Sequence, residues 1–328
     1  MGTSDRVRVR RFDADRKDQV TTLDKALSRK PSERQLLWID IAGDLEGDEL
    51  ERLTTGFELD PPTRRALETP GDRPHLGVHG GYLHLRIAAE PNDEHPDETP
   101  WLDVVGGHNV VITSHRAPVG LLDDLDERIE LDTSFGALDS GTFVASILDA
   151  SVTSYFRAVD AIEDEVDRLD AKSLHDDGRH ELLDELVALR RRIARLRRVL
   201  TDHRQVFAAL GGAEVAHVTD NPDSAPAFQA VAARFESAIG AVEASRDVLL
   251  GSFEVYMTRT AQRTNDVMKV LALATVLLLP GSLVAGLLGM NVTVPLSKDD
   301  PLAFWFVLVG VGLFALLILG IARARRWL

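Results

Sequence analysis

Two long apolar runs close the chain and dominate its hydropathy pattern. The first extends from Val270 to Ser297 and the second from Leu302 to Ala322, and neither contains a charged residue. About 20 helical residues are enough to cross the roughly 30 Å of bilayer hydrocarbon. A helix buried in a soluble core rarely stays uncharged on every face for so long. The pattern therefore predicts two transmembrane helices, 270–289 and 302–322, joined by a loop at 290–301.

Residues 1–140 alternate apolar and polar positions in the manner of half-buried strands. Gly and Pro clusters separate the runs, and two short helices fit between them, at 48–53 and 62–68. The alternation predicts a cytoplasmic α/β domain. Six histidines of this region lack metal-ligand spacing, and a strand or loop surface position is expected for each: His75, His79, His84, His95, His108 and His115. The predicted strands are Leu36–Ile41, Tyr82–Ile87, Val104–Val105 and Asn109–Thr113.

Residues 141–225 change to a helical period. Apolar residues recur near every 3.6 positions from Ala145 to Leu174, and the opposite face is acidic between Asp160 and Asp170. A second helix is predicted from His180 to Leu210, with an acidic start and an arginine-rich continuation. The two form a charged helical hairpin, whose acidic half either pairs with the basic half or binds regulatory cations.

The next predicted element is unusually long. No proline occurs from Ala227 to Leu279, so a single helix of about 53 residues, about 80 Å long, is allowed. This is far more than a bilayer needs, and residues 226–269 are therefore expected to form a cytoplasmic stalk. Because so long a helix is rarely stable alone, we expect it to pack against copies of itself.

Charge sets the orientation of the hairpin and limits its partners. Lys and Arg precede the first span and follow the second, in the basic tail 323–328, whereas the loop is slightly acidic. Both termini are therefore expected in the cytoplasm, with a multi-pass topology in the cytoplasmic membrane. The net charge of −15 argues against nucleic acid as a partner and is compatible with cation binding. The absence of cysteine excludes disulfides and thiolate metal sites.

Polar and small residues of the first span fall on one stripe. Their spacing of three or four residues places them on one face of the helix. Such a stripe either lines a water-filled path between several copies or holds membrane helices together. The stripe consists of Asn265, Met268, Leu271, Thr275, Leu279, Ser282 and Gly286. Acidic residues at heptad-compatible steps extend it toward the cytoplasm, among them Asp247 and Glu254, which are candidates for regulatory metal binding.

The last 70 or so residues contain four distinctive motifs: Thr264–Leu271, the mid-span Pro280, the tripeptide Gly289-Met290-Asn291 and the final Arg325–Leu328. These motifs resemble the CorA family of divalent-cation channels, with weaker similarity at Trp38–Asp40, Arg73-Pro74, Asn109–His115 and Arg197-Arg198. The resemblance implies a homopentamer with a cytoplasmic α/β domain, a long pore-lining helix and an outer second helix. It also implies that Gly-Met-Asn is the outer selectivity site and that cytoplasmic Mg²⁺ closes the channel.

The motif suits a hydrated hard ion. Mg²⁺ sheds water reluctantly, so a ring of Asn291 carboxamides can hold it through its waters. The loop at 292–296 and the Pro301–Trp305 segment also resemble the ZntB branch, whose members are linked to Zn²⁺. No His or Cys occurs after His217, which favours Mg²⁺, with Co²⁺ or Ni²⁺ as further cargo, over Zn²⁺.

Other function classes fit less well. A membrane-anchored cation sensor would explain the acidic domain but not the polar stripe or the Gly-Met-Asn motif. No catalytic constellation is present, so neither an enzyme nor a cofactor is predicted, and Mg²⁺ is expected as substrate and regulatory ligand. No acidic pair in the N-terminal domain matches the family's intracellular regulatory carboxylates.

Overall fold

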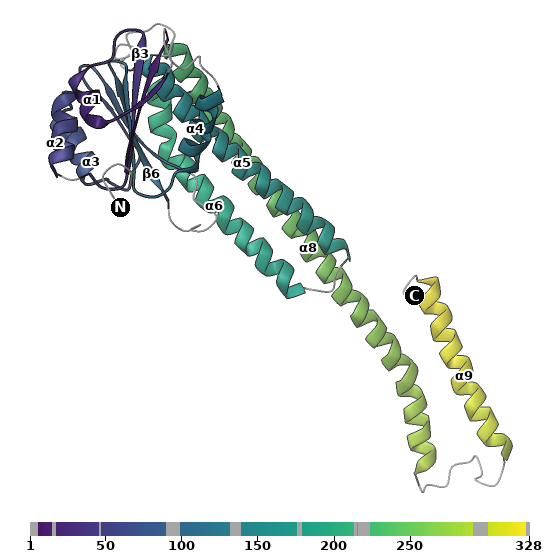
Figure 1. The fold of residues 1–328 in the computed structure, drawn as a ribbon. Helices are drawn as coiled ribbons and strands as arrows, with labels where there is room; N and C mark the ends of the chain where they lie inside the picture. The colour runs from purple at the N-terminus through teal and green to yellow at the C-terminus, as the bar shows by residue number, and fades with distance from the viewer. Residues whose placement is uncertain are drawn as a thin grey trace. The chain divides into compact units, whose positions relative to one another are not determined.

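The computed structural model describes residues 6–14, 18–45, 47–89, 99–131, 139–175, 179–212, 215, 224–290 and 301–325. The chain divides into two compact units, residues 1–250 and 251–328. The first contains the sheet and most of the helices, and the second contains the two apolar helical segments (Figure 1).

A mixed β-sheet forms the centre of the first unit. Within the described residues it has seven strands in the order β2-β1-β3-β7-β6-β5-β4. Neighbouring strands are antiparallel except β3 and β7, which are parallel with Leu37 opposite Val110. The strands are β1 (Val7–Asp13), β2 (Gln19–Thr21), β3 (Gln35–Ala42), β4 (His75–Val78), β5 (Leu83–Ala88), β6 (Trp101–Gly107) and β7 (Val110–His115).

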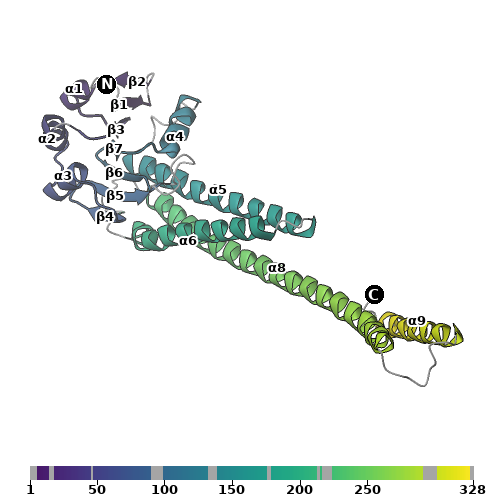
Figure 2. The same cartoon turned by 90° about the horizontal axis from the view of Figure 1, so that it is seen from below.

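Helices cover both faces of this sheet. In Figures 1 and 2, α1, α2 and α3 lie on one face, and α4, α5 and α6 lie on the other. This explains why β3 is a nearly continuous apolar run, since a strand covered on both sides needs no polar face. The helices are α1 (Leu23–Ser28), α2 (Gly47–Gly56), α3 (Pro61–Glu68), α4 (Gly120–Leu131), α5 (Ser140–His175), α6 (Arg179–Leu210), α8 (Ser224–Gly289) and α9 (Pro301–Ala324).

The first part of α8 packs through a regular seam. Its buried residues recur in alternating steps of four and three, the 3.5-residue repeat of helices that pack at a small angle. At the middle of the seam, Phe235 stacks on Phe207 of α6, with ring centroids 4.0 Å apart, and meets Tyr155 of α5 edge-on. Burial of a phenyl side chain contributes about 1.5–3 kcal/mol. The seam consists of Ser224, Phe228, Val231, Phe235, Ala238, Val242, Ser245 and Leu249.

Two side-chain hydrogen bonds fasten α5 and α6 to the end of β5. The Tyr155 hydroxyl donates to the carbonyl of Ala88 (2.7 Å), and the Ala88 N–H donates to Nε2 of His203 (2.7 Å). Nδ1 of His203 donates to the carbonyl of Val199, so Nε2 must remain unprotonated to accept. Burial lowers the pKa of His203 and keeps the ring in this neutral form.

The predicted fold class is confirmed. The predicted stalk and first span form one unbroken helix, α8, which has 66 residues and continues from Ser224 through Pro280 to Gly289. Proline at position 226 is tolerated because the first turn of a helix has no N–H partners to lose. Residues 224–249 pack against helices of the same chain, and packing of the helix against copies of itself stays a prediction.

The structure also contains elements that the sequence did not predict. Strands β1, β2 and β4 and helices α1 and α4 were all missed. The expectation of surface positions for the histidines is wrong for His84 and His115, which are 2% and 8% exposed. His95 lies outside the described residues.

Candidate ion pathway

Two helices of the second unit are long and apolar enough to cross a membrane, α8 and α9. The most apolar stretch of α8 is not buried in protein at all, and only 6% of that of α9 is. A hairpin in the core of a soluble protein would be mostly buried. This exposure of apolar surface therefore favours helices that face lipid or other copies of the chain.

The two helices meet along one face of each. On α9 the less exposed residues recur every three or four positions, at Val307, Val311, Ala315, Ile318 and Ala322. On α8 the corresponding residues are Leu273, Leu277, Pro280, Gly281 and Val284. A Cβ atom added to Gly281 would lie 3.6 Å from Cγ1 of Val311, an ordinary contact distance, which places this residue on the face toward α9.

The predicted polar stripe lies on the other side of α8. Because each helical residue advances by about 100°, its positions fall roughly opposite the face that meets α9. All seven residues of the stripe are exposed. The exposed fractions of Met268, Leu271 and Leu279 are 63%, 64% and 60%. The hydroxyl of Thr275 donates to the carbonyl of Leu271 (2.8 Å), which lets it sit in an apolar helix. The structure therefore separates the stripe from the contact between α8 and α9.

The Gly-Met-Asn tripeptide begins at the end of α8. Gly289 is the last residue of the helix, and Met290, which is 54% exposed, follows it. Asn291 lies outside the described residues, as do residues 292–300 and the final Arg326-Trp327-Leu328.

The structure does not gather the candidate regulatory carboxylates into a metal site. Asp247 and Glu254 are exposed on α8, and Asp247 lies 3.5 Å from the Arg246 side chain. Glu236, which shares their spacing, accepts two hydrogen bonds from Arg204 of α6. In the part of the chain that the structure describes, no three His, Asp or Glu side chains are placed to hold one metal ion.

Charged residues of the helical hairpin contact both each other and α8. Lys172 of α5 and Glu185 of α6 form an ion pair (2.8 Å) across the hairpin, with the base on α5 and the acid on α6. Within the acidic run of α5, Glu163 accepts a hydrogen bond from Ser245 of α8 (2.9 Å). This contact favours a structural role for Glu163.

Comparison with known proteins identifies the family to which this chain belongs. The model of the CorA-like Mg²⁺ transporter protein family matches residues 33–323. The chain belongs to the CorA family. Members of this family are transporters of divalent cations, so the protein is a membrane transporter and not an enzyme.

Individual relatives agree with this assignment but differ in the metal of their names. The cobalt/magnesium transport protein CorA of Thermotoga maritima is 24% identical over 89% of this chain and 83% of its own length. The zinc transport protein ZntB of Pectobacterium atrosepticum is also 24% identical, over 81% and 80% of the two chains. The structure of the complete CorA magnesium transporter from Methanocaldococcus jannaschii matches 98% of both chains with a TM-score of 0.77 at 19% identity.

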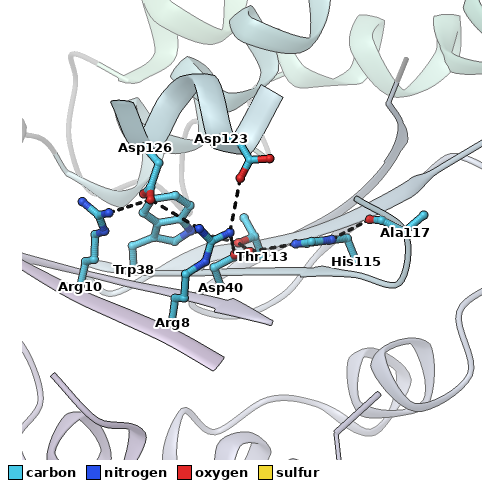
Figure 3. A network of polar contacts seen from close by, with 9 residues as sticks. All are labelled: Arg8, Arg10, Trp38, Asp40, Thr113, His115, Ala117, Asp123 and Asp126. Carbon is cyan, nitrogen blue, oxygen red and sulfur yellow. Dashed lines mark hydrogen bonds and ion pairs between the residues drawn. The ribbon is translucent and has the colours of Figure 1, made fainter. Parts of the chain in front are cut away.

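Two of the segments that resemble the CorA family meet in a buried polar network on strands β3 and β7 (Figure 3). The indole N–H of Trp38 donates to Oγ1 of Thr113 (3.0 Å), and Thr113 donates to Oδ1 of Asp40 (2.7 Å). Oδ2 of Asp40 accepts from Arg8 of β1 (3.0 Å). Arg8 in turn lies near Asp123 and Asp126 of α4, at 3.7 and 3.5 Å. The network thus joins three strands to the helix above them.

His115 lies next to the Asp40 carboxylate at the end of this network. Nδ1 donates to the carbonyl of Ala117 (2.7 Å), so Nε2, 3.5 Å from Oδ1 of Asp40, faces the carboxylate favourably only when it carries a proton. Burial lowers the pKa of His115, but the contact with Asp40 outweighs it and raises the pKa overall. For Asp40, burial alone would raise the pKa. The contacts of its carboxylate with His115, Thr113 and Arg8 outweigh burial, so the pKa of Asp40 is lowered overall.

We predict that this pair makes stability depend on pH. Because the folded pKa of His115 is raised, its contribution is complete below about pH 6.5 and is lost as pH rises through the folded value. The His115→Gln variant should be destabilised by about 1–3 kcal/mol at pH 6 and by less at pH 9. The midpoint of thermal unfolding, measured across this range in detergent, tests this, with His108→Gln as control. An equal loss of stability at both pH values would show that the ring acts only by packing.

Proposed function

We propose that this protein is a homopentameric channel that carries Mg²⁺, with Co²⁺ and Ni²⁺ as further cargo, through a path lined by the polar stripe of α8. The observation that carries the proposal is the exposure of this stripe on the face opposite α9. Around a symmetry axis, such a stripe supplies amide, hydroxyl and backbone oxygens from each copy. Helix α9 then lies outside, against lipid.

Asn291 is proposed as the outer selectivity residue. It is the amide of the Gly-Met-Asn tripeptide, and five carboxamide oxygens would recognise Mg²⁺ through its water shell. Neutral oxygens release the ion more readily than carboxylates do, which conduction requires. Gly289 gives the helix a tight end, and Met290 supports the ring from behind.

The choice of Mg²⁺ rests on the donor chemistry of the membrane segments. No His or Cys occurs after His217, so these segments offer oxygen and thioether groups, which suit a hard ion better than Zn²⁺. Transport of Zn²⁺ is the second candidate function, because the ZntB relative has the same 24% identity to this chain as the CorA relative, over a somewhat smaller share of it. The polar stripe and the family both favour transport over a membrane-anchored sensor.

In the proposed topology, both spans cross the inner membrane and both termini lie in the cytoplasm. Basic residues precede the first span, at Arg259, Arg263 and Lys269, and follow the second. The loop at 290–301 then faces outward.

Internal Mg²⁺ is proposed to close the channel. Asp247 and Glu254 of neighbouring copies would repel one another, and a divalent ion between them would relieve that repulsion. Loss of the ion would then shift the population toward open forms.

Substitution of the proposed selectivity residue should abolish transport. In liposomes that contain purified Asn291→Ala protein, Mg²⁺ uptake should fall to the level of empty liposomes, because the ring that binds the hydrated ion is gone. Uptake assays with Mg²⁺, Co²⁺, Ni²⁺ and Zn²⁺ in turn, with and without a pH gradient, also identify the cargo. Thr293→Ala, in the same loop, is the control. Normal Mg²⁺ flux through an assembled Asn291→Ala channel would remove this residue from the mechanism.

The apolar part of the stripe is predicted to form the gate. Rings of apolar side chains close a pore by excluding water. Met268→Asp should therefore hydrate the constriction and raise resting conductance in planar bilayers, whereas Met268→Leu should not. Unchanged conductance in assembled Met268→Asp channels would place the gate elsewhere.

Neutralising the proposed regulatory carboxylates should weaken closure by Mg²⁺. Millimolar internal Mg²⁺ should protect the unmodified cytoplasmic part from protease and reduce current. Both effects should weaken in the Asp247→Asn, Glu254→Gln double variant and persist in the Asp48→Asn, Glu51→Gln control, whose changes lie on α2. If internal Mg²⁺ alters neither proteolysis nor current in the unmodified protein, these carboxylates are only a solvated surface.

A further inference from the structure

Three histidines, His75, His79 and His84, lie close together at one face of the sheet. In the antiparallel pair of β4 and β5, Gly77 lies opposite His84 and His75 lies opposite Arg86. Alternate residues of a strand share a face, and so do residues directly opposite one another. His75, Gly77 and His84 therefore occupy the same face, and His79 follows immediately after β4. The rings of His75 and His84 meet edge-on, with centroids 5.8 Å apart.

The absent side chain of Gly77 leaves a space that two imidazole nitrogens border. A Cβ atom at this position would lie 3.0 Å from Nε2 of His79 and 3.1 Å from Nε2 of His75. Both nitrogens thus approach the same point from either end of the strand. A side chain here would occupy the space between them.

His79 is oriented in the way that metal-binding histidines usually are. Its Nδ1 contacts Oδ2 of Asp60 (2.7 Å), which fixes the proton on Nδ1 and leaves the Nε2 lone pair free to bind. The ring also stacks on Tyr82, with centroids 4.5 Å apart. Nε2 has one long contact, 3.3 Å, with the hydroxyl of Thr63, which keeps a shorter contact with Tyr82 (2.9 Å).

His75 is the second histidine whose Nε2 faces the space beside Gly77. His84 itself is committed elsewhere, since its Nε2 lies 2.9 Å from Oδ1 of Asp103, which Arg86 also binds through two hydrogen bonds. The arrangement thus offers two protein ligands, His75 and His79.

We propose that His75 and His79 bind a transition-metal ion such as Zn²⁺, Ni²⁺ or Co²⁺ through their Nε2 atoms, in the space beside Gly77. Imidazole nitrogen suits these ions, whereas Mg²⁺ prefers oxygen. Water completes the coordination, because no third His, Asp or Glu among the described residues is placed to join. The site belongs to the sheet of the first unit and is separate in the sequence from the proposed ion path.

Metal titration of the full-length protein tests this proposal. The purified protein in detergent is freed of metal with a chelator and titrated with Zn²⁺ at pH 7.5 by calorimetry. His75→Gln and His79→Gln should each lose one Zn²⁺ per chain, whereas the control His108→Gln should bind as the unmodified protein does. Asn291→Ala should also keep this Zn²⁺, which separates the site from the pathway. Zn²⁺ binding that survives both histidine substitutions would overturn the proposal.

Two further variants distinguish coordination from a structural effect. Gly77→Ala keeps both histidines but puts a methyl group in the space between their Nε2 atoms, so it should abolish Zn²⁺ binding. Its metal-free unfolding curve is measured alongside to verify that the variant is folded. Asp60→Asn should weaken binding by about 10–100-fold, because Asp60 orients His79. With Co²⁺ as probe, the visible absorption of nitrogen-ligated Co²⁺ should appear in the unmodified protein and be absent from Gly77→Ala. Unchanged binding in Gly77→Ala would contradict the proposed position of the metal.

Discussion

Helix α8 is one continuous helix whose first part packs against protein and whose later, apolar part does not. Residues 224–249 bury a 3.5-residue seam against α5 and α6, while the apolar stretch that follows is not buried in protein. In hydrocarbon every backbone group must find its partner within the helix, so only an uninterrupted helix or a closed barrel can cross. Pro280 is the exception, and it lies on the half-buried face toward α9. The opposite, exposed face of this segment carries the stripe that we propose lines the ion path.

Much of this architecture could be predicted because it follows from local sequence patterns. Uncharged runs of membrane length, a helical period and the alternating strands near Trp38 all depend on neighbouring residues. Strand β1 was missed for the same reason. Its alternation of Val7 and Val9 with arginines resembles a solvated segment, and only the fold shows that Arg8 and Arg10 reach carboxylates of Asp40 and Asp126. Such pairs join residues far apart in the sequence, and no local pattern records them.

The histidines show the same limit at a site. His75 and His79 are four residues apart, in β4 and just after it, and only the fold shows that their Nε2 atoms face one space. Gly77 between them is the sequence signal that could have indicated the site, because a larger residue there would fill that space. By contrast, the proposed stripe of α8 was visible in the sequence, since a single helix creates it.

The two proposed metal interactions use different chemistry, and this separation follows from where each donor type can be held. A transport path must release its ion, so neutral oxygens that contact the water shell of Mg²⁺ are suitable. A fixed site in the soluble unit can instead use nitrogen ligands, provided that the rings are neutral and oriented. Asp60 and the stacked Tyr82 supply that orientation for His79. The proposed imidazole site on the sheet can therefore bind Zn²⁺ without contributing any ligand to the proposed ion path.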